Sequence, residues 1–241
     1  MWCFWKEGFF GNEGFEKRYM SYLGKNKGIL LGHPEKSKVS LNYYDTIENA
    51  LTWHRKMLDV ALAQSMRRVA IFAEVTARLI ETLRSGHKVL VAGNGGSAAE
   101  AQHFAAELVG RFKRERSPYA VLSLTTDTSI LTAIANDYGY QDIFARQVLA
   151  LGQPDDMLIV FSTSGESENL LRAAAAAQQC LMTIIAITGD RPNRLECLAD
   201  VTVHVPTVDT AITQELHMMV THILCEIVES ELMSCEGDLG Q

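Results

Sequence analysis

Five short apolar runs alternate with helix-forming segments after Gly86, and this alternation constrains the fold of the 241-residue chain more than any other feature. The runs are Val89–Ala92, Ala120–Leu124, Met157–Phe161, Thr183–Ile187 and Val201–Val205. The helical segments between them are 98–112, 128–136 with 142–149, 167–179 and 193–198. Such alternation predicts an α/β fold with a parallel sheet and helices on both faces. Ligands of such sheets bind at the carboxyl ends of the strands.

Long helices are predicted on both sides of this alternating core. Residues 43–85 lack glycine and proline, and apolar residues recur there at helical spacing. They are Ile47, Leu51, Leu58 and Leu62 in a helix over 46–63, then Phe72, Val75, Leu79 and Leu83 in a second helix that ends before Gly86. A last helix is predicted over about 211–233. The apolar stripes of the first two helices have to be buried, and a partner subunit is a plausible recipient.

Composition narrows the class of protein. Hydrophobic residues make up 47% of the chain, enough for one full core, and the net charge of −7 argues against a general nucleic-acid binder. No apolar run approaches a membrane span, and no secretion signal opens the chain. The five cysteines form no C-x-x-C pair and are odd in number, which indicates free thiols in a reducing cytoplasm. We therefore expect a cytoplasmic protein without nucleic-acid or membrane partners.

Residues 1–40 differ from the rest of the chain. They hold eight of its 19 aromatic residues and six of its 17 glycines, without helical or strand periodicity. Residues 1–38 carry a charge of +3, so the remainder carries −10. We interpret this stretch as a poorly ordered extension or as upstream sequence joined by a wrong start, with an aromatic and basic docking arm as the alternative. The predicted domain is then 41–241, with helices over 43–85, an α/β core over 86–206 and the last helix.

A glycine-rich turn, residues 93–97, follows the first apolar run and leads directly into a helix. Strand, glycine turn and helix together present backbone N–H groups to an anion, and Asn94 or Ser97 can add side-chain donors. The helix carries His103 and Glu107, which share one face because they are four residues apart. Alone, the turn also fits ordinary turn chemistry and the pair also fits a surface ion pair. Their presence on one unit favours a ligand site.

A second polar turn follows the third apolar run, with the sequence Phe161-Ser-Thr-Ser-Gly-Glu-Ser167. Four hydroxyl groups lie within six residues, and Ser167 suits the N-cap of the next helix. An ordinary capped helix start is the simpler interpretation. Two such turns at strand ends of one sheet nevertheless favour a sugar phosphate or nucleotide held by neutral donors.

The last predicted helix carries Gln214, His217 and His222. Gln214 and His222 are about 12 Å apart along a helix axis and about 80° apart around it, so one ion could meet both only from a midway position. His217 points about 140° away from His222, and a structural role is the expected one for it.

Five segments together resemble the phosphoheptose isomerases of the sugar-isomerase (SIS) family. They are V-A-G-N-G-G-S at 91–97, H-F-A-A-E-L at 103–108, A-N-D-Y-G at 135–139, F-S-T-S-G-E-S at 161–167 and Q-E-L-H-M-M-V-T-H at 214–222. The resemblance covers about residues 43–233. It implies a flavodoxin-like five-stranded parallel sheet and a homotetramer with shared active sites. It also implies conversion of sedoheptulose 7-phosphate into D-glycero-D-manno-heptose 7-phosphate, for activated heptose and lipopolysaccharide biosynthesis.

The resemblance also implies the site residues. Glu107 and His222 resemble the catalytic base and acid of the family. One zinc ion per subunit is implied, and its ligands would be His103, Glu107, Gln214 and His222. The positions that resemble substrate contacts are Asn94, Gly95, Gly96, Ser97, Glu107, Asn136, Asp137, Ser162, Thr163, Ser164, Ser167 and Gln214. The chain departs from the family at Ile212-Thr213, where Arg-Ile is frequent, which bears on substrate choice.

Two other functions of the same fold remain as alternatives. One is a non-enzymatic regulator similar to the protein that binds the replication initiator DnaA, although that relative lacks the residues equivalent to Glu107 and His222. The other is a different sugar-phosphate isomerase or sugar sensor.

Overall fold

A five-stranded parallel sheet forms the centre of the computed structural model. The structure describes residues 43–238, except for the side chains of residues 44 and 234–238. The strands are β1 (Val89–Gly93), β2 (Val121–Ser123), β3 (Met157–Ser162), β4 (Thr183–Thr188) and β5 (Val201–His204). Their order is β2-β1-β3-β4-β5, the flavodoxin-like order. All five predicted runs form strands, which confirms the expected fold. The extension predicted over residues 1–40 lies outside the described residues.

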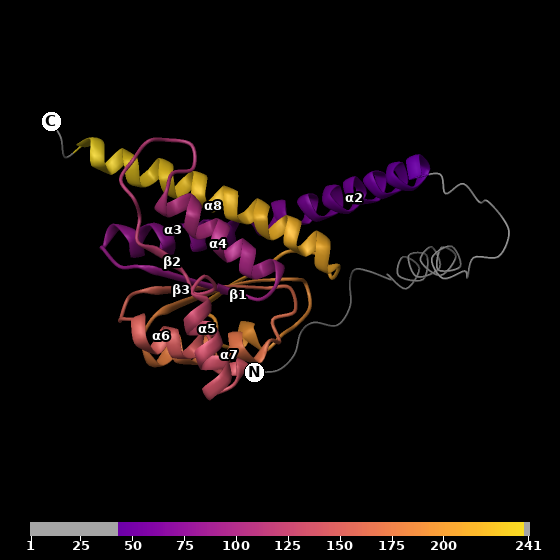
Figure 1. Ribbon diagram of the computed structural model, residues 1–241. Helices are drawn as coiled ribbons and strands as arrows, with labels where there is room; N and C mark the ends of the chain where they lie inside the picture. The colour runs from indigo at the N-terminus through magenta and orange to yellow at the C-terminus, as the bar shows by residue number, and fades with distance from the viewer. Residues whose placement is uncertain (1–42, 239–241) are drawn as a thin grey trace, which may run out of the picture. The chain divides into compact units, whose positions relative to one another are not determined.

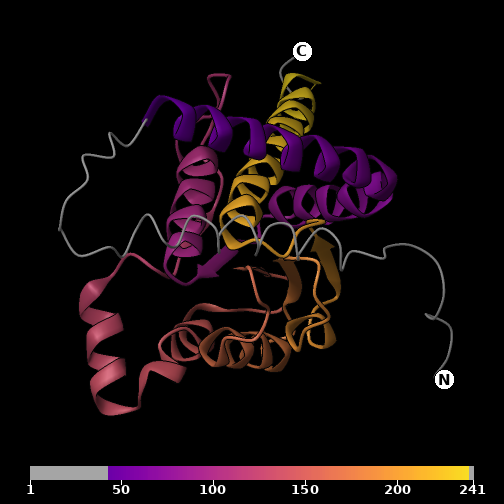
Figure 2. The same cartoon turned by 90° about the vertical axis from the view of Figure 1, so that its right-hand side faces the viewer.

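Helices cover both faces of this sheet (Figures 1 and 2). The helices are α2 (Tyr43–Ser65), α3 (Val69–Arg84), α4 (Gly96–Val109), α5 (Thr128–Asp137), α6 (Ala145–Leu151), α7 (Glu168–Gln179) and α8 (Thr210–Asp238), with 3₁₀ turns η1 (Met66–Arg68), η2 (Tyr140–Asp142) and η3 (Leu195–Cys197). Helices α3, α4 and α8 lie on one face, and α5, α6 and α7 on the other (Figure 1). Each face has its own apolar core, because both sides of every central strand are buried.

Some predicted helix limits were wrong for local reasons. Helix α4 begins at Gly96, two residues early, and ends at Val109 rather than at Phe112. Its end is set by Arg116, whose guanidinium donates hydrogen bonds to the carbonyl groups of Glu107 and Leu108. The helix predicted over 193–198 is only the turn η3, where the Asn193 side chain accepts a hydrogen bond from the Glu196 N–H.

The first two helices bury their apolar residues unequally. On α3, Val75 and Leu79 are completely buried in the core of this chain. On α2, Ala61 is buried, but Leu51 is 67% exposed and Leu62 is 40% exposed. Helix α2 therefore keeps an apolar surface that the described residues of one chain leave uncovered.

Two further expectations concern the cysteines and membrane-spanning helices. Cys180, Cys197 and Cys225 are free thiols, whereas the side chains of Cys3 and Cys235 lie outside the described ones. Among the described helices, none has the length and hydropathy of a membrane span.

The topology brings the two polar turns to one edge of the sheet. Strands β1 and β3 are hydrogen-bonded neighbours, and Gly93 pairs with Phe161 in register. From these ends the chain leaves to opposite faces, because Phe104 of α4 packs in one core and Leu170 of α7 in the other. The crevice between such diverging connections is the usual ligand site of an open α/β sheet.

Candidate active site

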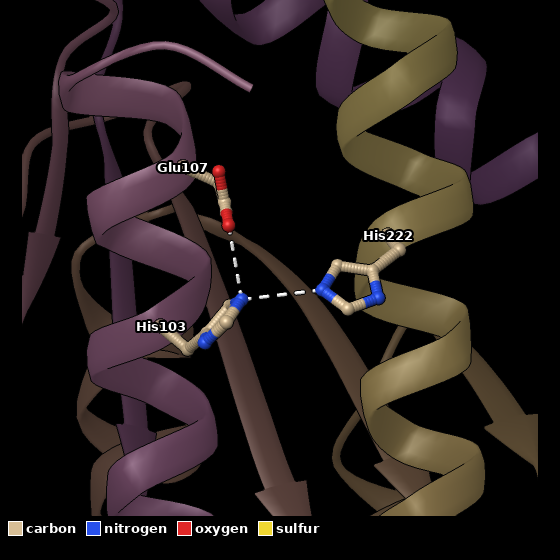
Figure 3. A group of neighbouring side chains, drawn as sticks. All are labelled: His103, Glu107 and His222. Atoms are coloured by element: carbon tan, nitrogen blue, oxygen red, sulfur yellow. Dashed lines mark hydrogen bonds and ion pairs between the residues drawn. The ribbon is translucent and has the colours of Figure 1, made fainter. Parts of the chain in front are cut away.

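Three side chains from α4 and α8 converge on one point (Figure 3). His103 Nε2 lies 3.0 Å from Glu107 Oε1 and 3.2 Å from His222 Nε2. The three potential ligand atoms all lie within 4.8 Å of one another. His103 is exposed, whereas Glu107 and His222 are half-buried. A single chain thus brings the His222 imidazole of α8 to the imidazole and carboxylate of α4. His222 lies 119 residues after His103 in the sequence.

Buried neighbours fix the facing orientation of these side chains. Phe104 and Leu108 each follow one of the α4 site residues and are completely buried, as is Leu224 of α8. The adjoining face of α4, about 100° around the helix, therefore presents His103 and Glu107 to α8. The ring of Phe112 stacks on the His222 imidazole, with centroids 5.6 Å apart and planes at 17°. This stack restricts rotation of the His222 ring.

The three donors suit a divalent metal ion. Two imidazole nitrogens and one carboxylate oxygen are the protein ligands of many catalytic zinc sites, which keep a further position open. Within the described part of the chain, His103, Glu107 and His222 form the one group of three such side chains whose ligand atoms lie close enough together to share an ion.

Gln214, the fourth residue of the expected ligand set, lies in the same cleft as His103. The α4–α8 cleft has a volume of about 490 Å³ and is lined by Gly96, Ala99, Glu100, His103, Ala211, Gln214, Glu215 and Met218. The Gln214 side chain lies against Gly96, where an added Cβ atom would be 2.3 Å from Gln214 Nε2. Only glycine at position 96 allows this approach.

His217 lies apart from the converging side chains. It is completely buried, and its Nδ1 is 3.2 Å from the Oε2 of Glu100, which is also buried. Its ring also packs against Phe161, with centroids 5.8 Å apart. This placement fits the structural role expected for His217.

The two polar turns are tied to each other directly. The side-chain amides of Asn94 and Asn169 form two reciprocal hydrogen bonds of 2.8 Å, and the Tyr140 hydroxyl donates to Asn94 Oδ1 at 3.1 Å. The Asn94 amide, expected to be a free donor, thus connects the turn after β1 with the start of α7.

The hydroxyls of the second turn are partly used within the turn. Ser162 Oγ accepts a hydrogen bond from the Gly165 N–H, and Ser164 Oγ accepts one from the Glu166 N–H. Ser167 is the N-cap residue of α7, as predicted, but its side chain forms no capping hydrogen bond. Ser167 and Asn94 instead line a second cleft, also of about 490 Å³, together with Tyr140, Gln141, Glu168, Asn169 and Arg172.

Some of the remaining expected contacts lie away from both clefts. Asn136 and Asp137 end α5, are exposed, and hydrogen-bond to each other at 2.7 Å. Neither residue lines the α4–α8 cleft or the second cleft. At the departure from the family pattern, Ile212 and Thr213 are buried and also line neither cleft.

Several residues near the site were missed in the sequence. Phe112 was assigned only to the end of a helix, and nothing in its local pattern indicates that it stacks on His222. Tyr140 and Arg172 line the second cleft from η2 and α7, and Arg172 is held there by Asp142 at 2.9 Å. Asn169, in the first turn of α7, was not predicted to contribute to the site. Its position two residues after the N-cap residue Ser167 was the one available signal.

Known proteins agree with this fold. Residues 53–189 match the family model of the SIS domain. The chain is 46% identical over 187 residues to the phosphoheptose isomerase of Helicobacter pylori (strain P12), covering 77% of this chain and 95% of that protein. The structure of a phosphoheptose isomerase from Neisseria gonorrhoeae superposes with a TM-score of 0.72 at 36% identity, covering 78% of this chain and all of that one. One from Francisella tularensis gives a TM-score of 0.69 at 36% identity, over 75% and 98% of the two chains.

The fold and the matched domain define the class: this is an SIS-domain α/β protein. Within that class the chain belongs to the phosphoheptose isomerase family, and it is an enzyme.

Proposed function

We propose that this protein converts sedoheptulose 7-phosphate into D-glycero-D-manno-heptose 7-phosphate. The observation that carries the proposal is the convergence of Glu107, His103 and His222 beside a cleft at the carboxyl edge of the sheet. An aldose–ketose isomerisation needs a base at carbon and an acid at oxygen, and a carboxylate beside an imidazole supplies both. The product would enter the synthesis of activated heptose for lipopolysaccharide.

In this mechanism Glu107 removes the proton from the carbon next to the carbonyl group, and an enediol forms. His222 moves protons at the substrate oxygens and assists ring opening. Triosephosphate isomerase, a well-described case, divides comparable work between a glutamate and a histidine. His103, 3.0 Å from Glu107 Oε1, orients the carboxylate toward the substrate.

One zinc ion per subunit would be held by His103, Glu107 and His222, with Gln214 as a fourth ligand. When bound, the ion would polarise the carbonyl group and stabilise negative charge on oxygen. A carboxylate that ligates metal is a weaker base, and glutamine is an unusual zinc ligand. We therefore expect a labile ion that orients the substrate at least as much as it activates it.

The substrate phosphate would bind at the two polar turns. The donors are the exposed backbone at Gly95 and Gly96, with Ser97 and the hydroxyls of Ser162, Thr163, Ser164 and Ser167. Support comes from the hydrogen bonds that hold both turns at one edge of the sheet. We assign Asn136 and Asp137 to the substrate site only by family resemblance, and they would reach it from a neighbouring subunit or after a movement of α5.

The assembly is proposed to be a cytoplasmic homotetramer with shared active sites. The exposed apolar residues of α2, together with Ile223 and Ile227 of α8, would supply the subunit contacts. The proposed SIS domain is 41–241, with residues 1–40 as an appendage.

A direct assay tests the function. Purified protein is given sedoheptulose 7-phosphate, and the heptose 7-phosphate formed is measured by chromatography. Turnover that disappears in Glu107→Gln supports the proposal. No turnover by the wild-type protein with or without added zinc would refute it, and a DnaA pull-down would then test the regulator alternative.

A further inference from the structure

A buried carboxylate on α8 holds the loop that leaves α4. Glu229 is 1% exposed and accepts hydrogen bonds from three consecutive backbone N–H groups. The donors are Phe112 at 3.0 Å, Lys113 at 2.8 Å and Arg114 at 3.0 Å. Burial raises the pKa of Glu229, but these hydrogen bonds and the charge of Arg116 outweigh it and leave the pKa below its ordinary value. Glu229 is therefore an anion at neutral pH.

The cation beside this carboxylate reaches the end of α4. The Arg116 side chain is completely buried, and its Nε lies 3.3 Å from Glu229 Oε1. Its Nη2 donates to the carbonyl oxygen of Glu107 at 2.9 Å, and its Nη1 donates to that of Leu108 at 2.9 Å. Arg116 thus binds the backbone of the proposed base itself.

The pair connects both halves of the candidate active site. Glu229 lies seven residues, or about two helical turns, after His222 on α8. Through Arg116 it is linked to the backbone of Glu107, and through its first hydrogen bond to Phe112, whose ring stacks on His222. One buried ion pair therefore fixes both the end of α4 and the ring that packs against the His222 imidazole.

We propose that Arg116 and Glu229 are positioning residues of the active site, which set Glu107 of α4 against His222 of α8 and hold Phe112 on the His222 ring. This inference rests on the proposed isomerase function. The alternative is that the pair matters only for the fold, because removing one partner of a buried ion pair destabilises a protein.

The chain offers a matched control for that alternative. Asp156, directly before β3, is also a buried carboxylate that accepts hydrogen bonds from two backbone N–H groups, those of Lys88 and Gln153, and from the Lys88 side chain. Glu229→Gln and Asp156→Asn make the same chemical change in two ion pairs whose carboxylates are buried. Only the first pair is joined to the active site.

The test compares the wild type with Glu229→Gln and Asp156→Asn. The values of kcat and KM are measured with sedoheptulose 7-phosphate at a temperature where near-ultraviolet circular dichroism shows each protein folded. The melting temperature of each protein is measured separately. Glu229→Gln should lower kcat about 10- to 100-fold, as loss of an outer partner of a reactive group does. Its KM should change much less, because the phosphate turns are untouched. Asp156→Asn should lower the melting temperature but keep the wild-type kcat.

A second pair of variants, at Phe112, tests the positioning role if Glu229→Gln does not fold. Phe112→Leu removes the stacked ring but keeps the backbone hydrogen bonds, and it should lower kcat about tenfold or more. Phe112→Tyr keeps the stack and should recover most of that loss. Wild-type kcat in folded Glu229→Gln or in Phe112→Leu, or equal kcat losses in Glu229→Gln and Asp156→Asn, would overturn the inference. An inactive wild-type enzyme would instead refute the proposed function.

Discussion

The Nε2 atoms of His103 and His222 face each other at 3.2 Å. A neutral imidazole offers one donor and one acceptor nitrogen, so one ring can donate its N–H to the other, or both nitrogens can bind one metal ion. Glu107, 3.0 Å from the same His103 atom, adds negative charge at that point. The carboxylate and the two ring nitrogens therefore gather between α4 and α8 the ligands that a zinc ion uses and the groups that proton transfer needs.

The first prediction concerns the proposed base. Glu107→Gln should keep the fold and lower kcat by about 10²- to 10⁴-fold, the usual contribution of general base catalysis. Glu74→Gln is the matched control, because Glu74 also forms an i,i+4 pair, with Arg78 at 2.8 Å, but lies on exposed α3 surface. Steady-state kinetics with sedoheptulose 7-phosphate measure both. Turnover by Glu107→Gln at the wild-type rate would remove Glu107 from its assigned role.

The second prediction concerns metal. Protein purified without chelator should contain about one zinc ion per subunit, and His103→Asn should weaken zinc binding at least about tenfold. Inductively coupled plasma mass spectrometry and competition with a zinc dye measure these two quantities. His87→Asn, a half-buried histidine before β1, should bind zinc like the wild type. Full activity after complete chelation would contradict an essential ion.

The third prediction concerns Gly96. Gly96→Ala places a Cβ atom where Gln214 Nε2 now lies, so the Gln214 side chain has to move out of the α4–α8 cleft. Because a flexible side-chain end can move, the loss of unfolding free energy should be about 1 kcal/mol or less, the usual scale of a helix-surface change. We expect kcat/KM to fall about tenfold or more, because Gln214 is the proposed fourth zinc ligand and even the outer partners of a metal site contribute that much. Equal kcat/KM for the variant and the wild type would show that the position of Gln214 does not matter.

The fourth prediction concerns assembly. Leu51→Glu puts a charge on the exposed apolar surface of α2 and should shift the protein from tetramer toward smaller species. Thr52→Glu, on an exposed neighbouring position of the same helix, should leave the assembly intact. Sedimentation velocity at several concentrations distinguishes the two. A Leu51→Glu protein that remains fully tetrameric would place the subunit contact elsewhere.

The fifth prediction concerns acid stability. Burial raises the pKa of Asp156, but hydrogen bonds from Lys88 and Gln153 outweigh it and hold the pKa below the ordinary 3.8. The ionised carboxylate therefore stabilises the fold above about pH 4, and this contribution is lost as the pH falls through the folded-state pKa. Asp156→Asn should cost about 1–3 kcal/mol at neutral pH and progressively less at about pH 3. Urea unfolding across this pH range measures the difference, and a constant difference would contradict the assignment.

The local pattern of the sequence predicted the elements of the fold well. Each apolar run became a strand, because a central strand of a covered parallel sheet needs apolar residues on both faces. Helix limits were less predictable. The end of α4 depends on Arg116, and the shape of η3 depends on Asn193, and both act through hydrogen bonds that periodicity does not contain.

The candidate site was predictable only in part. His103 and Glu107 share a helix face by spacing alone, whereas the approach of His222 was expected from family resemblance and not from the spacing of the last helix. Phe112, Tyr140 and Arg172 escaped notice because their roles arise from contacts between distant segments.

The amino-acid sequence by itself determined the alternating strands and helices, the two polar turns and the pairing of His103 with Glu107, because these follow from local periodicity and turn chemistry. The tertiary structure alone decided that His222 meets that pair, that Glu229 holds the loop after α4, and that α2 keeps an uncovered apolar face. The physical reason is that these features depend on how α4 and α8 pack over one face of the sheet, and packing brings together residues that no local pattern connects.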